Sequence, residues 1–304
     1  MTASTRILVL SVLLCGCSAG AFAQGNCVET ASEVQAQVSA ETQRELETKL
    51  NEARAAYEKD QRSVDNFIWL GRRTAYLARY KDAIKIYSDG IKQFPSDARL
   101  YRHRGHRLIT LRCFDAAIAD LEQASKLIKG KPDEIEPDGL PNARNIPTST
   151  LQSNIWYHLG LAYYLKGDFE RALTAYREAE KVSKNPDMLV ATTHWLYMTL
   201  RRLGRTKEAN RTLAPIKDNF DLIENGDYYK LIRVYKGQLD AANLWLEINQ
   251  RSNSLSNATL GYGVGNWYLY NGQRAEAEKI FRQVTAGNQW SSFGYIAAET
   301  ELKR

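Results

Sequence analysis

The four histidines are the first residues that could do chemistry: His103, His106, His158 and His194. His103 and His106 stand three residues apart in "YRHRGHRL", so they share one side of a helix. Arg102, Arg104 and Arg107 surround them, and these positive charges disfavour a metal cation. No cysteine or carboxylate lies beside the pair. The sequence therefore predicts polar residues of a helix surface or groove rather than metal ligands.

An acidic segment, "PDEIEPDGLPN" at 132–142, is the second candidate. Its four carboxylates, followed by Gly139, are Asp133, Glu134, Glu136 and Asp138. Alternating carboxylates before a glycine imitate the start of a calcium loop. The imitation fails because Asn145 stands where a bidentate glutamate belongs, and because Pro137 and Pro141 restrict the backbone. The segment predicts neither a calcium site nor a catalytic acid pair.

Motifs of the common enzyme classes are absent from the sequence. It contains no nucleophile elbow, phosphate loop, HExxH motif or CxxC pair. The stretch "GYGVG" at 261–265 lacks the glycine spacing of a dinucleotide fingerprint. We therefore predict a protein that is not an enzyme and that holds no metal or cofactor.

Composition narrows the class of partner. The hydrophobic fraction of 44% argues against wholesale disorder. The formal charge is +6 with 25% charged residues, a mild basic excess that favours acidic partners. This excess is far from a nucleic-acid signature, so no specific nucleic-acid partner is predicted.

The N-terminal residues are typical of an export signal. Arg6 precedes the apolar run Ile7–Cys15, which is too short to span a bilayer as a helix, and small residues follow it. "AFA" at 21–23 fits ordinary cleavage, which makes the signal peptide 1–23. "LCGC" at 14–17 resembles a bacterial lipobox, which makes the signal 1–16 and Cys17 the lipidated residue.

Both processing sites predict an exported protein of the periplasm or cell envelope, and the lipobox predicts an outer-membrane lipoprotein. A lipid on Cys17 would be the only membrane attachment. After ordinary cleavage only Cys27 and Cys113 remain. They could pair in an oxidising compartment, but one lies in an expected tail and the other in an expected helix turn. We therefore expect two unpaired thiols.

An internal repeat of 34 residues organises the rest of the chain. Gly71, Ala83 and Tyr87 match Gly105, Ala117 and Leu121 at this spacing. The next unit is displaced by 21 further residues, which are an insertion within 130–152. Later units follow up to residue 289, and the one at 225–250 is poorly matched.

The best unit is "NIWYHLGLAYYLKGDFERALTAYREAEK" at 154–181. Its pattern resembles the tetratricopeptide repeat through Trp156, Leu159, Gly160, Tyr163, Ala172, Tyr176 and Ala179. The resemblance implies an all-α, right-handed helix-turn-helix solenoid of about six repeats with a capping helix at each end. Thr74 and Thr193 depart from the pattern because they stand where the family prefers aromatic residues.

The expected organisation follows the repeat. Residues 24–63 form a tail and lead-in helix, 64–129 hold units 1 and 2, and 153–289 hold units 3 to 6. Residues 290–304 form a C-terminal capping helix. Its expected water-facing residues are Glu299, Glu301, Lys303 and Arg304.

The resemblance also implies a binding surface, since the first helix of each pair lines a concave face that holds extended peptides in this family. The residues placed on that face are Arg72, Arg99, Arg102, His106, Tyr157, Tyr164, His194, Arg201, Tyr262 and Asn266. Arginine and tyrosine are typical interface anchors, and arginine pairs with carboxylates. The alternative is a solvated basic face. The predicted partner is a protein or peptide of acidic character.

The insertion follows directly after the arginine-rich helix around Arg102. Its tethered carboxylates have a high effective concentration for that helix. We expect the loop to pack on this basic surface, either as a fixed part of the fold or as a displaceable cover.

Together these features predict a protein–protein interaction scaffold of the bacterial envelope. Two alternatives stay open. One is a structural accessory subunit of an envelope enzyme or secretion complex, which would purify with stoichiometric partner chains. The other is a binder of an acidic polymer or lipid, whose binding would collapse with added salt.

Overall fold

The computed structural model describes residues 26–249 and 254–304. The predicted signal segment and the lipidation candidate Cys17 lie outside these residues. Within the described residues the fold is all-α, and the only extended pairing is an isolated bridge between Ile135 and Thr150. None of the described helices is long and apolar enough to cross a membrane.

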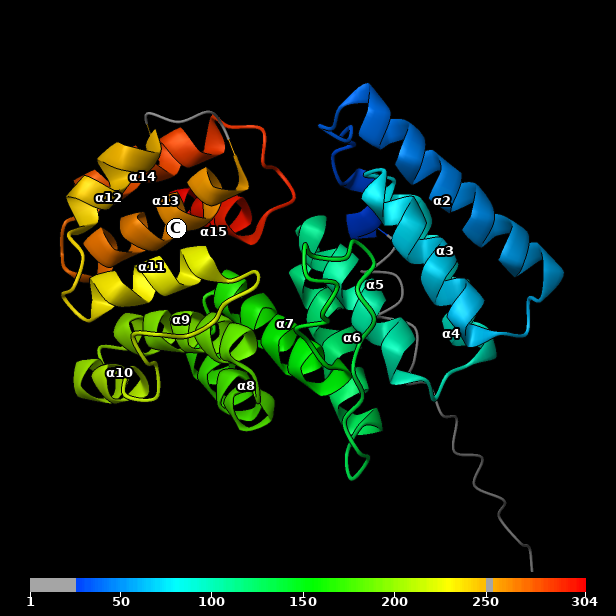
Figure 1. Ribbon diagram of the computed structural model, residues 1–304, viewed down its shortest axis with the longest axis horizontal. Coiled ribbons are helices and arrows are strands. Elements are labelled where there is room, and N and C mark those ends of the chain that lie inside the picture. Colours follow the sequence, from blue (N-terminus) through cyan, green and yellow to red (C-terminus); the bar gives the residue numbers. More distant parts are fainter. Residues whose placement is uncertain (1–25, 250–253) are drawn as a thin grey trace, which may run out of the picture.

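The helices follow one another as pairs that build a solenoid (Figure 1). Helix α2 (Ala40–Lys59) packs against the first pair. The pairs are α3 (Val64–Tyr76) with α4 (Tyr80–Gln93), α5 (Ala98–Thr110) with α6 (Phe114–Leu127), α7 (Leu151–Lys166) with α8 (Phe169–Val182), α9 (Pro186–Arg202) with α10 (Thr206–Thr212), α11 (Gly226–Tyr235) with α12 (Ala241–Asn249), and α13 (Leu255–Tyr270) with α14 (Arg274–Thr285). Helix α15 (Phe293–Leu302) ends the chain.

The repeat pattern follows from close helix packing. In the α7–α8 pair, a Cβ atom on Gly160 would lie 2.7 Å from the ring of Tyr176, so only glycine lets the two helices approach this closely. In the α13–α14 pair, Gly265 and Phe281 have the same relation at 2.5 Å. Both pairs of residues are 16 apart in sequence, and so are Gly71 with Tyr87 and Gly105 with Leu121. This spacing places a small residue of the first helix opposite a large residue of the second.

The fourth and fifth pairs depart from this regularity. Helix α10 spans only seven residues, and α11 packs on α9 and α13. Helix α12 packs on α13. The weak match of the sequence at 225–250 therefore corresponds to a real change in packing.

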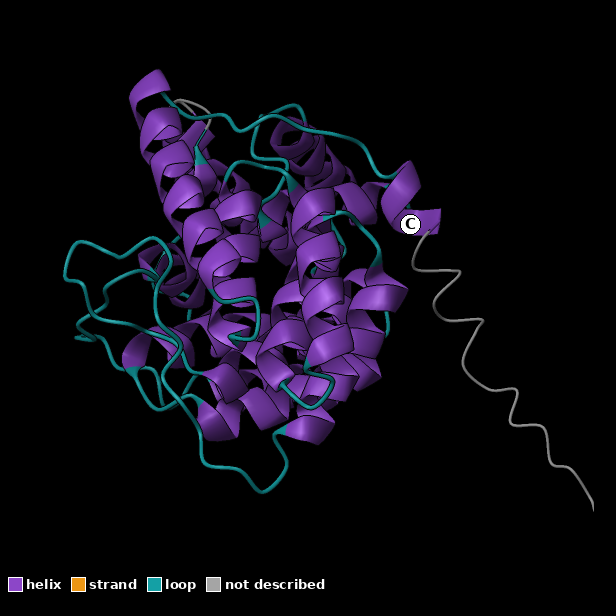
Figure 2. Cartoon of the chain, turned by 90° about the vertical axis from the view of Figure 1, so that its right-hand side faces the viewer, coloured by secondary structure: helices purple, strands orange, loops and turns teal. Residues whose placement is uncertain are grey.

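The last helix packs on the last pair, as expected of an end cap, and it also contacts an earlier unit. Helix α15 packs on α13 and α14 and also reaches α7, so it lies on the inner side formed by the first helices. Ile296, Ala297 and Ala298 are fully buried there. Burial of these apolar residues stabilises the docking of α15. The stacked helices are shown along the chain in Figure 1 and with their connecting loops in Figure 2.

This placement corrects the expectation for the polar residues of α15. Glu301 is only 5% exposed and accepts hydrogen bonds from Arg202 at 2.6 Å and Arg304 at 2.5 Å. Glu299 accepts from Arg112 at 2.9 Å and binds the exposed Lys303. Lys303 is exposed as expected, and the side chain of Arg304 is 26% exposed.

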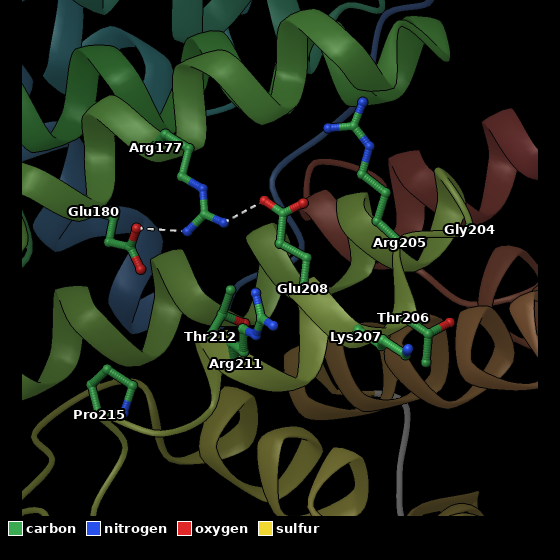
Figure 3. Close-up of a pocket in the computed structure, with 10 residues that line it drawn as sticks. All are labelled: Arg177, Glu180, Gly204, Arg205, Thr206, Lys207, Glu208, Arg211, Thr212 and Pro215. Atoms are coloured by element: carbon green, nitrogen blue, oxygen red, sulfur yellow. Dashed lines mark hydrogen bonds and ion pairs between the residues drawn. The ribbon is translucent and has the colours of Figure 1, made fainter.

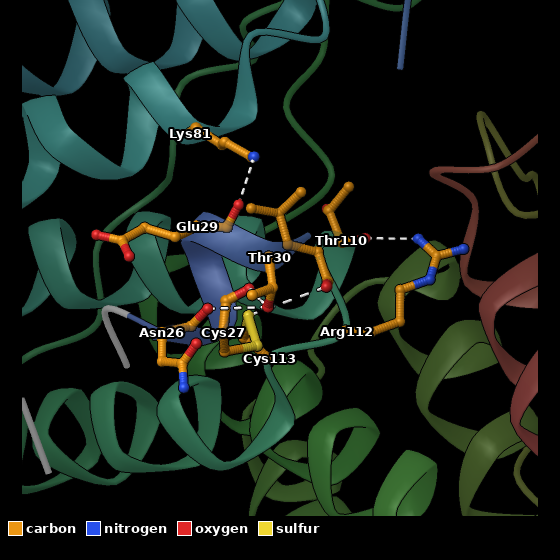
Figure 4. Close-up of a disulfide and its surroundings, with 9 residues drawn as sticks. Asn26, Cys27, Glu29, Thr30, Lys81, Thr110, Arg112 and Cys113 are labelled. Atoms are coloured by element: carbon orange, nitrogen blue, oxygen red, sulfur yellow. Dashed lines mark hydrogen bonds between the residues drawn. A yellow bond between two sulfur atoms is a disulfide. The ribbon is translucent and has the colours of Figure 1, made fainter. Parts of the chain in front are cut away.

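The two cysteines form a disulfide, which corrects the expectation of free thiols. Residues 26–30 form a short helical turn that lies against the corner between α5 and α6, and this brings Cys27 within a Cα–Cα distance of 5.8 Å from Cys113 (Figure 4). Lys81 on α4 donates a hydrogen bond to the Glu29 carbonyl at 2.9 Å. The N-terminal segment is therefore docked on the fold.

Candidate functional site: the inner face of the array

The predicted concave-face residues divide into two groups. Arg72, Arg99, His106 and Arg201 are half-buried. The buried group contains Arg102, Tyr157, Tyr164, His194, Tyr262 and Asn266. This corrects their predicted placement on an open face. The physical reason is that the insertion and α15 lie on the side formed by the first helices.

The buried aromatic residues of the inner side form part of the core. The hydroxyl of Tyr262 donates to that of Tyr164 at 2.8 Å, and both rings pack edge-on or stacked against Trp195. Tyr235 bonds His194 at 3.0 Å. Burial lowers the pKa of His194 to about 3, so its ring is neutral at physiological pH. These side chains stabilise the array and do not face a partner.

The insertion covers the first helices of units 1 and 2. The Glu136 carboxylate binds Nη2 of Arg102 at 3.0 Å and lies 3.8 Å from Nε2 of His103. Asn154 donates to its other oxygen at 3.1 Å. The expectation that the loop packs on the arginine-rich helix is therefore confirmed at Glu136.

The other arginines of that helix have partners outside the insertion. Arg99 pairs with Asp65 and Asp97, and Arg104 makes two hydrogen bonds to Asp120. Within the insertion, Asp133 accepts from the Gln152 backbone N–H at 3.0 Å. The acidic loop thus meets the basic helix through one carboxylate rather than four.

Farther along, the insertion contacts the segment before α11. Arg144 makes two hydrogen bonds of 2.6 Å to Asp221, and Thr148 donates to Glu224 at 2.6 Å. The loop therefore crosses from α3 and α5 to the middle of the array. The sequence predicted the contact with α5 but not this second attachment.

Three histidines lie beside these contacts: His103 and His158 are buried, and His106 is half-buried. Burial and neighbouring arginines hold the pKa values of His103, His106 and His158 well below the usual range. Nδ1 of His103 lies 3.0 Å from Arg102, and Nδ1 of His106 lies 2.7 Å from Arg107. Because arginine only donates, both Nδ1 atoms accept, and both neutral rings carry their proton on Nε2.

A pocket of about 460 Å³ remains open on the inner side. Its lining includes His106 from α5, Asp227 and Tyr228 from α11, Thr259 from α13, and Phe293 at the start of α15. Carboxylate, hydroxyl, imidazole and aromatic groups therefore converge from four helices. Of the predicted face residues, His106 is the one that lines this pocket.

A second, shallower groove of about 920 Å³ lies on the outer side between α8 and α10 (Figure 3). Arg177 lies between Glu180 and Glu208, at 2.9 and 2.8 Å. Lys207 and Arg211 also line the groove, and neither forms an ion pair with the residues that the structure describes. The prediction of a basic concave face missed this groove because it lies on second helices, where the family pattern assigns no ligand.

Metal binding has no candidate in the described part of the chain, where no three His, Cys, Asp or Glu residues come together. The described residues that line the two sides of the array offer hydrogen-bonding groups and charge.

Comparison with known proteins supports the repeat assignment. Residues 153–186, which hold α7 and α8, match the tetratricopeptide repeat model. No curated protein matches the chain. The chain therefore contains a tetratricopeptide repeat at the unit where the sequence pattern is clearest.

Similar solved structures include tetratricopeptide proteins of low identity. A tetratricopeptide repeat protein from Parabacteroides merdae is 13% identical, with 92% of this chain and 99% of that chain covered and a TM-score of 0.49. YrrB, a tetratricopeptide protein with an unusual peptide-binding site, is 15% identical, with coverage of 83% and 98% and a TM-score of 0.43. MamA is 15% identical, with coverage of 72% and 93% and a TM-score of 0.43.

Proposed function

We propose that this protein is a non-enzymatic scaffold that binds a protein or peptide on the inner face of its repeat array. The observation that carries the proposal is the open pocket among α5, α11, α13 and α15. Its lining supplies acceptors at Asp227, a donor at His106 and ring surfaces at Tyr228 and Phe293. A peptide main chain needs donors and acceptors together, and aromatic surfaces anchor its side chains.

Filling the pocket tests this proposal. Thr259 lines it from α13, so Thr259→Arg places a long side chain inside. Thr174 is exposed on α8, and Thr174→Arg adds the same side chain outside the pocket. In a crosslinked pulldown from the cell envelope, we expect the wild type and Thr174→Arg to retain the partner and Thr259→Arg to lose it. Retention by Thr259→Arg would contradict binding in this pocket.

The site of action that we propose is the bacterial envelope. Two features support export: the apolar run Ile7–Cys15 after Arg6, and the Cys27–Cys113 disulfide, because disulfides persist mainly in oxidising compartments. Mass spectrometry of the mature N-terminus tests it. A chain that begins at Gln24 or at a lipidated Cys17 supports export, and a chain that still begins at Met1 contradicts it.

A second candidate function is that of a structural accessory subunit. The insertion and α15 favour this function because they cover much of the inner face. A subunit that only holds other subunits together needs no free groove. Purification from the envelope distinguishes the two functions. Stoichiometric partner chains that survive Thr259→Arg would favour the accessory subunit.

The outer groove favours a third candidate, an acidic polymer or lipid. Lys207 and Arg211 point to such a partner because their charges are not neutralised by ion pairs with described residues. Binding of this kind weakens steeply with salt. A partner that is lost on raising the salt concentration and on Lys207→Gln with Arg211→Gln, but not on Thr259→Arg, would support it.

A further inference from the structure

We propose that the inner face of α3 and α5 is a binding site for an extended acidic peptide, and that residues 136–139 of the insertion occupy it as an internal ligand. The inference rests on the proposed scaffold function and names the chemistry of its partner. It places this site beside the open pocket, on the two first helices that precede α7.

The segment is held as a bound peptide would be. Arg72 donates from Nη1 to the Pro137 carbonyl at 2.8 Å, and Arg73 donates from Nη1 to the Gly139 carbonyl at 2.6 Å. Both guanidinium groups lie over the ring of Trp69, at 4.6 and 5.0 Å from its centroid. Two arginines thus donate hydrogen bonds to two main-chain carbonyls, and the ring of Trp69 supports the positions of both arginines.

The Glu136 carboxylate is the charged group of the segment that binds α5. Glu136 is the residue that reaches Arg102, and the side chains of both are about nine-tenths buried, at 11% and 9% exposure. An arginine buried to this degree needs a carboxylate or an equivalent acceptor. The ligand therefore has a carboxylate at this position, and a neutral residue cannot replace it without leaving Arg102 unpaired.

A closely packed glycine follows three residues later. A Cβ atom on Gly139 would meet the hydroxyl of Tyr76 and would lie 2.8 Å from Nη2 of Arg72, so a larger residue would have to displace these side chains. Pro137 lies between, exposed, with no N–H to satisfy. The internal ligand thus presents a glutamate and, three residues on, a glycine.

Two buried atoms show that the internal ligand leaves the site partly unsatisfied. Nε of Arg102 and Oδ2 of Asp138 have no hydrogen-bond partner among the residues described. A carboxylate that engaged Nε and Nη2 together would gain one charge-assisted bond over Glu136. A partner peptide with that geometry would compete with the insertion.

The apolar side chains of the segment add little to its docking. Ile135 is 70% exposed and Leu140 is 59% exposed, so undocking uncovers little apolar surface. The segment is held by the polar contacts described above and by tethering, which is equivalent to about a millimolar concentration of ligand. A free peptide should therefore bind weakly to the wild type and well to a chain whose own segment is removed.

The experiment supplies the segment as a separate peptide. A fluorescent peptide of residues 132–142 is titrated by anisotropy against the wild type and against a full chain in which 134–141 is a Gly-Ser linker of equal length. Matched peptides carry Glu136→Gln or, as a control, Glu134→Gln, because Glu134 is exposed beside the contact. We expect the linker chain to bind the native and Glu134→Gln peptides at least about tenfold more tightly than the Glu136→Gln peptide.

Two results would overturn the inference: a linker chain with native helical content that binds no peptide, or equal binding of the Glu136→Gln peptide. If the linker chain does not fold, the full chain with Glu136→Gln decides. It should bind the native peptide more tightly than the wild type does, and equal binding would overturn the proposal. These results can be told apart from a failure of the proposed scaffold function. In that case the peptide would still bind to the linker chain, but the pulldown from the envelope would recover no partner.

Discussion

Two segments of the chain lie on the inner side of the array, and they are held in different ways. The insertion and α15 each place a buried carboxylate on an arginine of a first helix, Glu136 on Arg102 and Glu301 on Arg202. Glu301 has a second arginine partner, Arg304, whereas Glu136 leaves one donor of Arg102 unused. The same type of ion pair is complete in one segment and incomplete in the other.

Apolar burial separates the two segments further. Helix α15 buries Ile296 and its neighbouring alanines completely, while the insertion leaves Ile135 mostly in water. Burying an isoleucine side chain contributes roughly 1.5–3 kcal/mol. Helix α15 is therefore part of the core, whereas the insertion has the features of a covalently attached ligand.

The largest expected effect distinguishes the two ion pairs. Glu301→Gln removes the buried carboxylate that Arg202 and Arg304 share among packed helices, so it should cost about 3–5 kcal/mol of unfolding free energy. Glu136→Gln should cost only about 1–2 kcal/mol, because release of the insertion lets water reach Arg102. Urea unfolding of both variants measures the difference. Equal losses would show that the insertion is as firmly built in as α15.

Reducing the disulfide comes next. The Cys27–Cys113 bond closes a loop of 86 residues next to Arg112, which binds Trp290 and Glu299 of the C-terminal segment. Replacing both cysteines with alanine should lower the free energy of unfolding by about 2–4 kcal/mol. Binding of the 132–142 peptide to the linker chain should not change, since that site is built from α3 and α5. Loss of peptide binding would show that the disulfide supports the α3–α5 site, contrary to this expectation.

Acidification should destabilise the array because four histidines are held neutral in the native state. The pKa values of His103, His106 and His158 lie well below the unfolded value of about 6.5, and that of His194 is about 3. Below pH 6.5 the unfolded chain therefore binds protons that the native chain excludes. Stability is fully present above that pH and falls below it, by about 1.4 kcal/mol per pH unit for each histidine.

Urea unfolding between pH 7.5 and 5 checks this dependence. His106 and His158 pack against Phe293 of α15, whereas His103 faces Glu136 of the insertion. Replacing His106 with asparagine should reduce the pH slope by one proton. A stability that does not change across this interval would mean that water reaches the rings, and the inner side would be open.

The smallest effect on stability concerns the outer groove. Lys207 and Arg211 are exposed and lack ion pairs with described residues, so replacing both with glutamine should change the free energy of unfolding by less than about 0.5 kcal/mol. The same double variant should weaken any salt-sensitive binding of an acidic polymer. A large loss of stability would show that the two cations support the fold.

The parts of this structure that the sequence predicted are local or periodic. The contact between Gly160 and Tyr176 recurs at 16 residues in four pairs, so a single chain displays it repeatedly. The contact of Arg304 with the Tyr164 carbonyl spans 140 residues, and no period marks it. The disulfide was missed for the same reason, because nothing near Cys27 indicates that its helical turn docks on the α5–α6 corner.

The candidate site was predicted in part. Tethering alone indicated that the acidic loop meets the arginine-rich helix, but nothing in the sequence distinguishes Glu136, which binds Arg102, from Glu134. The concave-face residues were assigned from family geometry. Six of them are buried, because the insertion covers Arg102, because α11 packs on His194, and because α15 lies over part of the same side. The sequence of α15 resembles that of an ordinary end cap.

Native-state hydrogen exchange tests the central distinction most directly. The Glu136 amide bonds Ser149, the Leu151 amide bonds Glu134, and the Ile296 amide bonds Ser292 at the start of α15. We expect the first two amides to exchange through a local opening that added denaturant barely changes, and the Ile296 amide to exchange only with global unfolding. Exchange of all three amides with the same free energy and the same denaturant dependence would contradict the account of the insertion as an internal ligand.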